Sequence, residues 1–433
     1  MKDDVKSGDL AQTAVDTFLA FTDEAVAAYY EACVHCGECA EACHFYLSTG
    51  DPKYTPTYKL FPMVRAYKRE KAPFAGLKKA LGLAPRPVTE QEIRDWEELV
   101  YDSCTMCGRC TLVCPMGIDI AGTIRKVREG YAAVGLVPKG LTDLIANVER
   151  TTSPMGITPK ALLKQIEIQE KATGIKVEVD KVGADYMVIL SSMEIMGFPE
   201  VIGAYARIFK AAGVDWTIST RAYEGTNLGV QMGSSKVARE IVQRTVDEAE
   251  RLGVKYLISP ECGHAYGAIR WAGPNLIGRP FKFEVVHVIE LLDQLRREGR
   301  LPPVKRDARR LTLHDPCQIV RRGGLLKEPR DIIGVAAEDY VPMPGDGVVN
   351  FCCGGGGGVS ANPRAEELKL KAFAPKQEQL DAIDGLEGVV VPCANCRTVF
   401  EDALDDRGIE LDVLGLTELL ADAAAALETD DKA

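Results

Sequence analysis

The sequence predicts a multidomain chain of mixed α+β and α/β class: a helical amino-terminal domain, then tandem α/β repeats with parallel sheets. Three observations support this fold class. Residues 33–114 hold two tight runs of four cysteines. From residue 186 onward, strand-like runs alternate with amphipathic helical runs, as in parallel sheets covered by helices. The second half of that region also repeats the first, at an offset of about 124 to 132 residues.

Length and composition set the broad class. The chain has 433 residues, 46% hydrophobic and 27% charged, which is enough for two or three domains with sizeable cores. Its net charge of −11 gives no general attraction to nucleic acid or anionic lipid. Without a secretory signal or a long apolar run, we expect a chain that does not itself span a membrane. Fourteen cysteines in such a chain indicate metal binding rather than disulfides.

Four segments are expected. Residues 1–150 form a two-cluster domain of the ferredoxin-like kind, and residues 151–185 form a linker. Residues 186–305 form a first α/β repeat without a cluster of its own, and residues 306–433 form a second repeat that binds one. The opening stretch from Asp9 to Tyr30 is predicted to be one amphipathic helix, because its apolar residues recur at helical spacing.

The two cysteine runs have the spacing of bacterial ferredoxins, in which the fourth cysteine of each run ligates the other cluster. One predicted cubane [4Fe-4S] cluster is therefore bound by Cys33, Cys36, Cys39 and Cys114. The other is bound by Cys104, Cys107, Cys110 and Cys43. A pair of zinc sites is the alternative, but zinc does not need four evenly spaced thiols twice.

The strands of the repeats are predicted from short apolar runs. In the first copy they are Tyr186–Ser191, Asp215–Ser219 and Lys255–Ser259, and in the second Arg310–His314, Val348–Phe351 and Val389–Pro392. The clearest helical stretches are Val237–Leu252 and Pro363–Leu380. Residues Val285–Leu292 of the first copy correspond to Val413–Leu420 of the second.

The second copy is organised around Asn350–Gly358, where two adjacent cysteines precede five glycines. Adjacent side chains of a strand point to opposite faces, so both thiols reach one metal centre only where the backbone bends sharply. Glycine permits that bend and a close approach of the main chain. The glycines do not form a nucleotide-binding loop, because the Lys-Ser/Thr of a P-loop is missing. With the flanking cysteines, the predicted iron–sulfur ligands of this copy are Cys317, Cys352, Cys353, Cys393 and Cys396.

In the first copy, the positions that correspond to these five cysteines carry other residues: Met193, Tyr223, Glu224, Glu261 and His264. We therefore expect no cluster there, and we expect the corresponding loops of the two copies to face each other across a cleft. Cys262 is the one cysteine outside a ligand spacing. Three roles stay open for it: a catalytic thiol that captures substrate sulfur, an extra ligand, or a buried structural residue. His264 is a candidate acid or base beside Cys262 or a core hydrogen-bonding residue, and His314 a candidate hydrogen-bonding partner of the cluster.

The cysteine runs, joined to tandem halves with a Cys-Cys-Gly motif and a C-x-x-C, resemble the D-type catalytic subunit of heterodisulfide reductase. The resemblance covers essentially the whole chain. It implies one noncubane [4Fe-4S] cluster on Cys317, Cys352, Cys353, Cys393 and Cys396, in addition to the two cubane clusters. With the first copy emptied, the chain is most similar to the K-type subunits of Dsr membrane complexes in sulfur metabolism. The partners that this implies are a membrane b-type cytochrome or other quinone-linked subunit, and a small sulfur-carrier protein or thiol disulfide.

We therefore expect an iron–sulfur oxidoreductase that reduces, or forms, a disulfide or trisulfide at the noncubane cluster. By this resemblance it is cytoplasmic and attached to the membrane through partner subunits. The alternative is an electron-transfer subunit of a flavin- or quinone-linked dehydrogenase, of the glycolate oxidase or glycerol-3-phosphate dehydrogenase type. The direction of the reaction, the disulfide and the identity of the partner subunits stay open.

Overall fold

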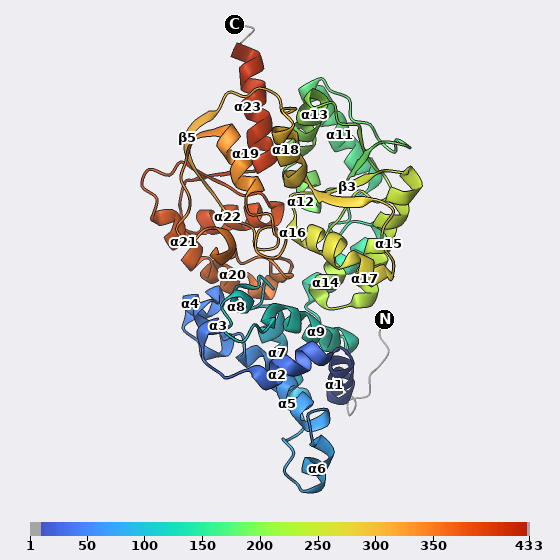
Figure 1. Ribbon diagram of the computed structural model, residues 1–433, viewed down its shortest axis with the longest axis vertical. Coiled ribbons are helices and arrows are strands. Elements are labelled where there is room, and N and C mark those ends of the chain that lie inside the picture. The colour runs from blue at the N-terminus through green and yellow to red at the C-terminus, as the bar shows by residue number, and fades with distance from the viewer. Residues whose placement is uncertain (1–9, 431–433) are drawn as a thin grey trace. The chain divides into compact units, whose positions relative to one another are not determined.

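The computed structural model describes residues 10–430 as two compact units (Figure 1). Unit 1 extends to Thr142 and also takes in Gly229–Lys236 and Gly354–Pro375. Unit 2 contains the remaining segments, Asp143–Leu228, Val237–Cys353 and the chain from Lys376 onward. The glycine run thus packs with the amino-terminal unit, whereas the two cysteines before it pack with the repeats. Within the described residues, no helix is both long and apolar enough to cross a bilayer.

Unit 1 is helical, as predicted. Its helices are α1 (Leu10–Ala20), α2 (Glu24–Ala32), α3 (Glu38–Glu41), α4 (His44–Thr49), α5 (Phe61–Glu70), α6 (Ala75–Ala80), α7 (Glu90–Tyr101), α8 (Arg109–Leu112), α9 (Ile120–Ala133), α14 (Leu228–Met232) and α20 (Glu366–Ala372). A Cβ at Gly130 of α9 would lie 2.6 Å from the Ala14 carbonyl oxygen of α1, so glycine lets these two helices approach closely.

The single opening helix expected from Asp9 to Tyr30 is wrong. The chain forms α1 and α2 instead, because Asp23 begins a new helix by accepting a hydrogen bond from the Val26 amide at 3.0 Å. Asp9 itself lies outside the described residues.

The first sheet of unit 2 has the order β2-β1-β3-β4, with every pair parallel. Its strands are β1 (Tyr186–Val188), β2 (Trp216–Ile218), β3 (Tyr256–Ser259) and β4 (Glu284–His287). Its helices include α12 (Ser192–Met196), α13 (Glu200–Ala211), α15 (Ser235–Leu252), α16 (Gly263–Tyr266), α17 (Gly273–Ile277) and α18 (Val288–Arg297). Parallel strands buried on both faces need helices on each side, which explains the continuous apolar runs.

The second sheet has the order β6-β5-β7-β8 and is also parallel. Its strands are β5 (Asp307–Leu313), β6 (Ala337–Tyr340), β7 (Gly388–Val390) and β8 (Asp412–Leu414). Its helices are α19 (Glu328–Ala336), α21 (Ala374–Asp381), α22 (Ala394–Asp406) and α23 (Leu416–Asp430). The strand order matches that of the first sheet element for element, so the predicted internal repeat is present in the fold.

Two predicted elements of the second copy are wrong. Val348–Phe351 is not a strand: a 3-10 turn covers Gly347–Val349, and the edge position belongs to β6. The predicted helix Pro363–Leu380 is divided into a 3-10 turn, α20 and α21. Pro375 explains the second break, because proline is tolerated in the first turn of a helix but not in its interior.

The segment expected as a linker begins at the last residue of α10 (Lys139–Thr151) and contains α11 (Pro159–Thr173). Helix α11 packs on α13, where a Cβ at Gly203 would lie 2.8 Å from the Gln169 side-chain oxygen. The domain boundaries at residues 150, 185 and 305 stay a prediction.

The two repeats contact each other through two pairs of helices. Helix α13 of the first repeat packs on α23 of the second, and α19 of the second packs on α18 of the first. In each pair, a helix early in one repeat meets the last helix of the other. This is the pattern of a pseudo-two-fold axis.

Candidate functional site

The cysteines of the two runs gather in unit 1 at two separate cavities. One, of about 150 Å³, is lined by Cys33, Cys36, Cys39 and Cys114. A tighter one, of about 30 Å³, is lined by Cys43, Cys104, Cys107 and Cys110. Each cavity thus draws three cysteines from one run and one from the other, and thiols are the donors that iron–sulfur clusters take.

The loops of the two runs share one backbone conformation. His35 and Met106, each just before the second cysteine of its run, have φ of 54° and 55°. Gly37 and Gly108, each just after that cysteine, have φ of 90° and 77°. Non-glycine residues rarely adopt positive φ, so the same strained turn in both runs indicates a shared requirement.

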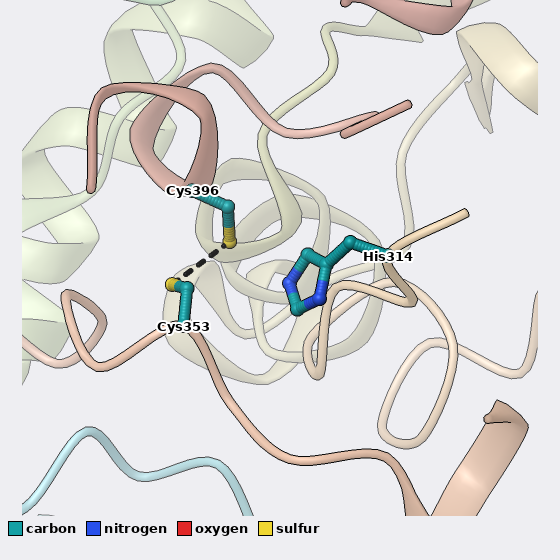
Figure 2. Close-up of side chains that lie close together, drawn as sticks. All are labelled: His314, Cys353 and Cys396. Carbon is teal, nitrogen blue, oxygen red and sulfur yellow. Dashed lines mark hydrogen bonds between the residues drawn. The ribbon is translucent and has the colours of Figure 1, made fainter. Parts of the chain in front are cut away.

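All five cysteines of the second repeat are buried in unit 2. The sulfurs of Cys353 and Cys396 lie 3.1 Å apart, and those of Cys317 and Cys352 lie 3.8 Å apart. In Figure 2 the ring of His314 is turned toward Cys353 and Cys396, and potential ligand atoms of all three residues lie within 4.8 Å of one another. The five side chains are thiols rather than disulfide sulfurs, so the donor set is one that fits an iron–sulfur cluster.

The elements explain why these thiols converge. Cys317 follows β5, and Cys393 follows β7 directly before α22, whose first turn carries Cys396. Carboxyl ends of parallel strands meet at one edge of a sheet, which is where ligand sites form in such folds. Cys352 and Cys353 enter from the irregular segment after β6.

Within unit 1, the glycine run packs on a cysteine run. A Cβ at Gly357 would lie 2.8 Å from the carbonyl oxygen of Cys104, and Gly357 has φ of 62°. The fully buried Arg128 links these segments by donating to the carbonyl oxygens of Gly357 at 2.5 Å and Cys104 at 2.9 Å. Here glycine is needed for close backbone approach to the loop of one predicted cubane cluster.

One cation near the adjacent cysteines was missed by sequence reasoning. The Lys376 ammonium is fully buried and donates to the side-chain oxygens of Asn350 and Gln379. Burial lowers the pKa of Lys376 to about 7, and the negative charges of Asp315 and of nearby cysteines, Cys352 among them, oppose this shift. No signal in the sequence marks Lys376, because it lies in an ordinary helical stretch.

The predicted His314 lies at this site. Its ring nitrogen Nδ1 lies 3.3 Å from the Asn350 amide nitrogen, and its ring packs on Phe400. Burial, with the Lys376 charge, lowers the pKa of His314, so the ring is neutral. A neutral imidazole can donate one hydrogen bond to a cluster sulfur.

The loop of the first repeat that carries Cys262 packs directly on the cysteine loops of the second. The Ala394 amide donates to the Glu261 carbonyl at 2.8 Å, and a Cβ at Gly263 would lie 2.5 Å from the Gln318 Cβ. The prediction of a cleft between these loops is therefore wrong, because the loops touch at these contacts. The Gly263 amide lowers the pKa of Cys393, and the Cys393 charge raises the pKa of Cys262, so these two cysteines are neighbours.

The structure also corrects the alignment of the two copies at this loop. Cys262 directly precedes α16, as Cys393 directly precedes α22, and both have extended backbone angles. By helix start, Cys262 corresponds to Cys393, and Ala265 corresponds to Cys396. Pairing Glu261 with Cys393 and His264 with Cys396 is thus shifted by one residue. The cysteine directly before each helix was a sequence signal that could have shown the correct alignment.

Cys262 is buried, and its pKa is raised by burial and by the nearby Cys393, so it is a neutral thiol. The amides of Ala265 and His264 oppose that shift by pointing toward its sulfur. His264 is half-buried in the first turn of α16. The structure therefore brings Cys262 to the cysteine site, and places His264 beside it in the chain.

Buried carboxylates surround this loop, and no spacing in the sequence groups them. The Glu261 carboxylate accepts from the Thr417 amide at 2.9 Å, and the Glu261 amide donates to Glu194 at 3.2 Å. Glu418 pairs with Arg397 at 2.7 Å. Burial raises the pKa of Glu194 to about 7, and burial with the Glu418 charge raises that of Glu261 to about 8. These groups can hold protons near neutral pH.

Known proteins match the chain in two parts and along its length. A model described as a 4Fe-4S dicluster domain matches residues 29–118, and one described as a cysteine-rich domain (CCG) matches residues 311–401. The Hdr-like menaquinol oxidoreductase iron–sulfur subunit of Archaeoglobus profundus is 28% identical over 91% of this chain and 79% of its own length. The D-type subunit of the dihydromethanophenazine:CoB–CoM heterodisulfide reductase of Methanosarcina barkeri is 25% identical, over 91% and 93%. The EtfAB:quinone oxidoreductase of Syntrophomonas wolfei is 26% identical, over 86% and 55%.

The two domain matches coincide with the cysteine sites: residues 29–118 contain both runs, and residues 311–401 contain all five cysteines of the second repeat. Neither range extends over the first repeat, which agrees with its missing ligand set. The chain therefore joins a 4Fe-4S dicluster domain to a CCG domain, and it is homologous to the D-type subunits of heterodisulfide reductase and to Hdr-like menaquinol oxidoreductase iron–sulfur subunits.

Proposed function

We propose that this chain is the disulfide-converting subunit of a membrane-linked redox complex. The two mixed sets of run cysteines would hold two cubane clusters, which would supply electron transfer with a quinone-linked partner. The five cysteines of the second repeat would hold a noncubane cluster, which would supply the chemistry for cleaving or forming a disulfide or trisulfide of a small sulfur-carrier protein or thiol. The observation that carries this proposal is the convergence of five buried thiols with a sixth, Cys262, contributed by the repeat that has no ligand set.

The cluster, when bound, supplies one-electron chemistry and iron that accepts sulfur as a ligand. Reduction of a disulfide takes two electrons and two protons and yields two thiols. The chain's own residues would supply the compensating charge and the thiol beside the cluster. A protonated Lys376 would place a positive charge beside the cysteines, which would offset the negative charge of thiolate ligands. Cys262 lies as a neutral thiol where a substrate sulfur meets the site.

The protons have a source close to Cys262. Glu194 and Glu261, whose pKa values of about 7 and about 8 lie near neutral pH, are linked by the hydrogen bond from the Glu261 amide. A group whose pKa lies near the working pH is both a good donor and readily reprotonated. Tyr205 donates to Glu194 at 3.2 Å and completes this buried network.

An electron-transfer role without disulfide chemistry is the second candidate, because a relative that matches 86% of the chain is an EtfAB:quinone oxidoreductase. The deciding experiment is paramagnetic resonance of the anaerobically purified, oxidised holoprotein with and without a thiol substrate such as a reduced sulfur-carrier protein. Disulfide chemistry at the five-cysteine site predicts a new signal that depends on the thiol. A spectrum that no thiol changes, with the cluster content intact, contradicts the first proposal and favours the second.

A further inference from the structure

Residues 65–86 of unit 1 form a projection with a charge opposite to that of the whole chain. Its basic residues are Arg65, Lys68, Arg69, Lys71, Lys78, Lys79 and Arg86. Its one acidic residue is Glu70, whereas the whole chain has a net charge of −11. The segment comprises the end of α5, all of α6 and the chain beyond it, and α6 lies at the end of unit 1 past α5 (Figure 1).

The tip of this projection exposes large apolar side chains. Phe74 is 75% exposed, Leu77 58%, Leu81 62% and Leu83 71%. Isolated exposed apolar residues are normal on a protein surface, but four within ten residues form a patch that marks an interaction site. Phe74 also has φ of 64°, a left-handed conformation that is uncommon for an aromatic residue.

The projection is held in a fixed conformation. Arg69 donates to the Pro85 carbonyl at 2.6 Å, which joins the end of α5 to the returning chain. The Leu83 amide donates to the Lys78 carbonyl at 2.7 Å, and Lys79 pairs with Glu70. The apolar side chains are thus presented by an ordered turn rather than by a loose loop, which lowers the ordering cost of binding.

We infer that residues 65–86 bind directly to the surface of an anionic lipid bilayer, with Phe74, Leu77, Leu81 and Leu83 in the interfacial region. Apolar side chains combined with lysines and arginines are typical of segments that lie in a membrane interface. Clustered basic residues are attracted to anionic headgroups. A second copy of this chain is a poor occupant, because a symmetric contact would bring two strongly basic patches together.

The base of the projection adjoins one of the predicted cubane sites. Val64, Arg65, Lys68 and Pro85 line a largely apolar cavity of about 330 Å³ that Cys33 also lines. Membrane contact through the projection would therefore hold that cysteine loop close to the bilayer, on the side from which a quinone-linked partner delivers electrons. The inference deepens the proposed membrane-linked function, but it concerns lipid binding alone and is independent of the disulfide chemistry.

The experiment is sedimentation of the full-length, cluster-loaded protein with extruded vesicles, without any partner subunit. One vesicle type is phosphatidylcholine, and the other is a mixture of phosphatidylcholine and phosphatidylglycerol. We expect binding to the anionic vesicles that weakens when salt is raised from about 0.1 M to about 0.5 M, because salt screens charge. K78E/K79E and, separately, L77D/L81D should each lower the affinity by about tenfold or more.

The matched control is L163D, which places a charge at another exposed leucine, on α11 in unit 2 (43% exposed). It should bind vesicles as the unaltered protein does. Iron content and the helical circular dichroism signal of every variant show that it is folded. Absence of binding to anionic vesicles, equal binding to both vesicle types, or an equal loss in L163D would overturn the inference. In the first of these cases the projection would be a docking surface for a protein instead.

Discussion

The two repeats of unit 2 have the same parallel sheet with the same strand order, yet only one has the cysteines for a cluster. Where the second repeat places thiols, the first satisfies its loops with ordinary hydrogen bonds. Tyr223 donates to the Ile157 carbonyl at 2.6 Å, and Glu224 accepts from the Ser192 amide at 2.9 Å. The same sheet and covering helices therefore form in the first repeat without these five cysteines, and the two repeats differ in the loops at the strand ends.

The first repeat has nevertheless kept one feature of the second. Cys262 stands before α16 as Cys393 stands before α22, so one thiol of the ligand set survives in the emptied copy. The loops then meet across the pseudo-two-fold axis, and the retained thiol lies beside the cysteines of the other copy.

The largest expected effect comes from making the second repeat more like the first. Cys396→Ala places in α22 the residue that α16 has at the corresponding position, Ala265. We expect iron to fall from about twelve to about eight per chain, since one four-iron cluster is lost while two cubane clusters remain. Disulfide turnover should vanish. Iron analysis and thiol production with a viologen donor measure both.

The sheet itself should survive that change, because the first repeat forms the same sheet without these ligands. The control is therefore circular dichroism, together with the cubane resonance signals, which should be unchanged. An unfolded second repeat would show that the cluster holds the fold together, and about twelve irons remaining would show that Cys396 is not a ligand.

The next effect concerns the retained thiol. Cys262→Ser should leave the iron content unchanged and lower disulfide turnover by about tenfold or more, the scale of losing a reactive thiol. Electron transfer from an artificial donor to the clusters should persist. Full turnover would assign Cys262 a structural role, and a loss of iron would make it a ligand.

Much of this architecture could be predicted because it depends on local pattern. The two cysteine runs, the strand–helix alternation and the repeat are all visible as spacing in the sequence. The wrong predictions have physical causes that are not local. Val348–Phe351 has the apolar pattern of a strand, but the turn that brings Cys352 and Cys353 inward replaces it. Helix α11 lies where a linker is predicted, because its surface is polar, although its other face packs on α13.

The sequence could predict that the five cysteines belong to one site, with His314 and Cys262 as candidates beside them, and their role as ligands stays a prediction. Lys376 and the buried carboxylates Glu194 and Glu261 come from elements far apart in the sequence, and their roles follow from burial, which no spacing encodes. The basic residues of the projection are evident in the sequence, but the net charge of −11 for the whole chain drew attention away from this local cluster. That all its apolar tip residues are exposed could be learned only from the fold.

A smaller effect, on stability, tests the hydrogen-bonded loop of the first repeat. Burial raises the pKa of Glu224 to about 7, and hydrogen bonds from Ser192 oppose that shift. The folded state thus favours the protonated carboxyl. The contribution of protonated Glu224 to the stability of the fold is fully present below the pKa that Glu224 has in the unfolded chain. This contribution is lost as the pH rises through about 7.

Glu224→Gln keeps the neutral form at every pH. We expect equal thermal stability of variant and unaltered protein near pH 4, and at pH 8 a more stable variant, by up to roughly 3 kcal/mol. Melting temperatures across this range measure it. If the difference in melting temperature between variant and unaltered protein were the same at all pH values, Glu224 would be ionised in the folded state.

The smallest effect is expected at Tyr223, which the sequence alignment places opposite Cys352. Its hydroxyl donates to the Ile157 carbonyl at 2.6 Å and lies 3.2 Å from the Thr151 carbonyl. Tyr223→Phe keeps the ring and leaves a buried carbonyl without its donor, so we expect a loss of about 1–2 kcal/mol in unfolding free energy. Iron content should not change, because the first repeat holds no cluster in our proposal. Tyr256→Phe, in β3 where the ring stacks on Tyr186, is the matched control and should cost less. If Tyr223→Phe released iron, the first repeat would contribute to a cluster after all, and the contrast between the two copies would fail.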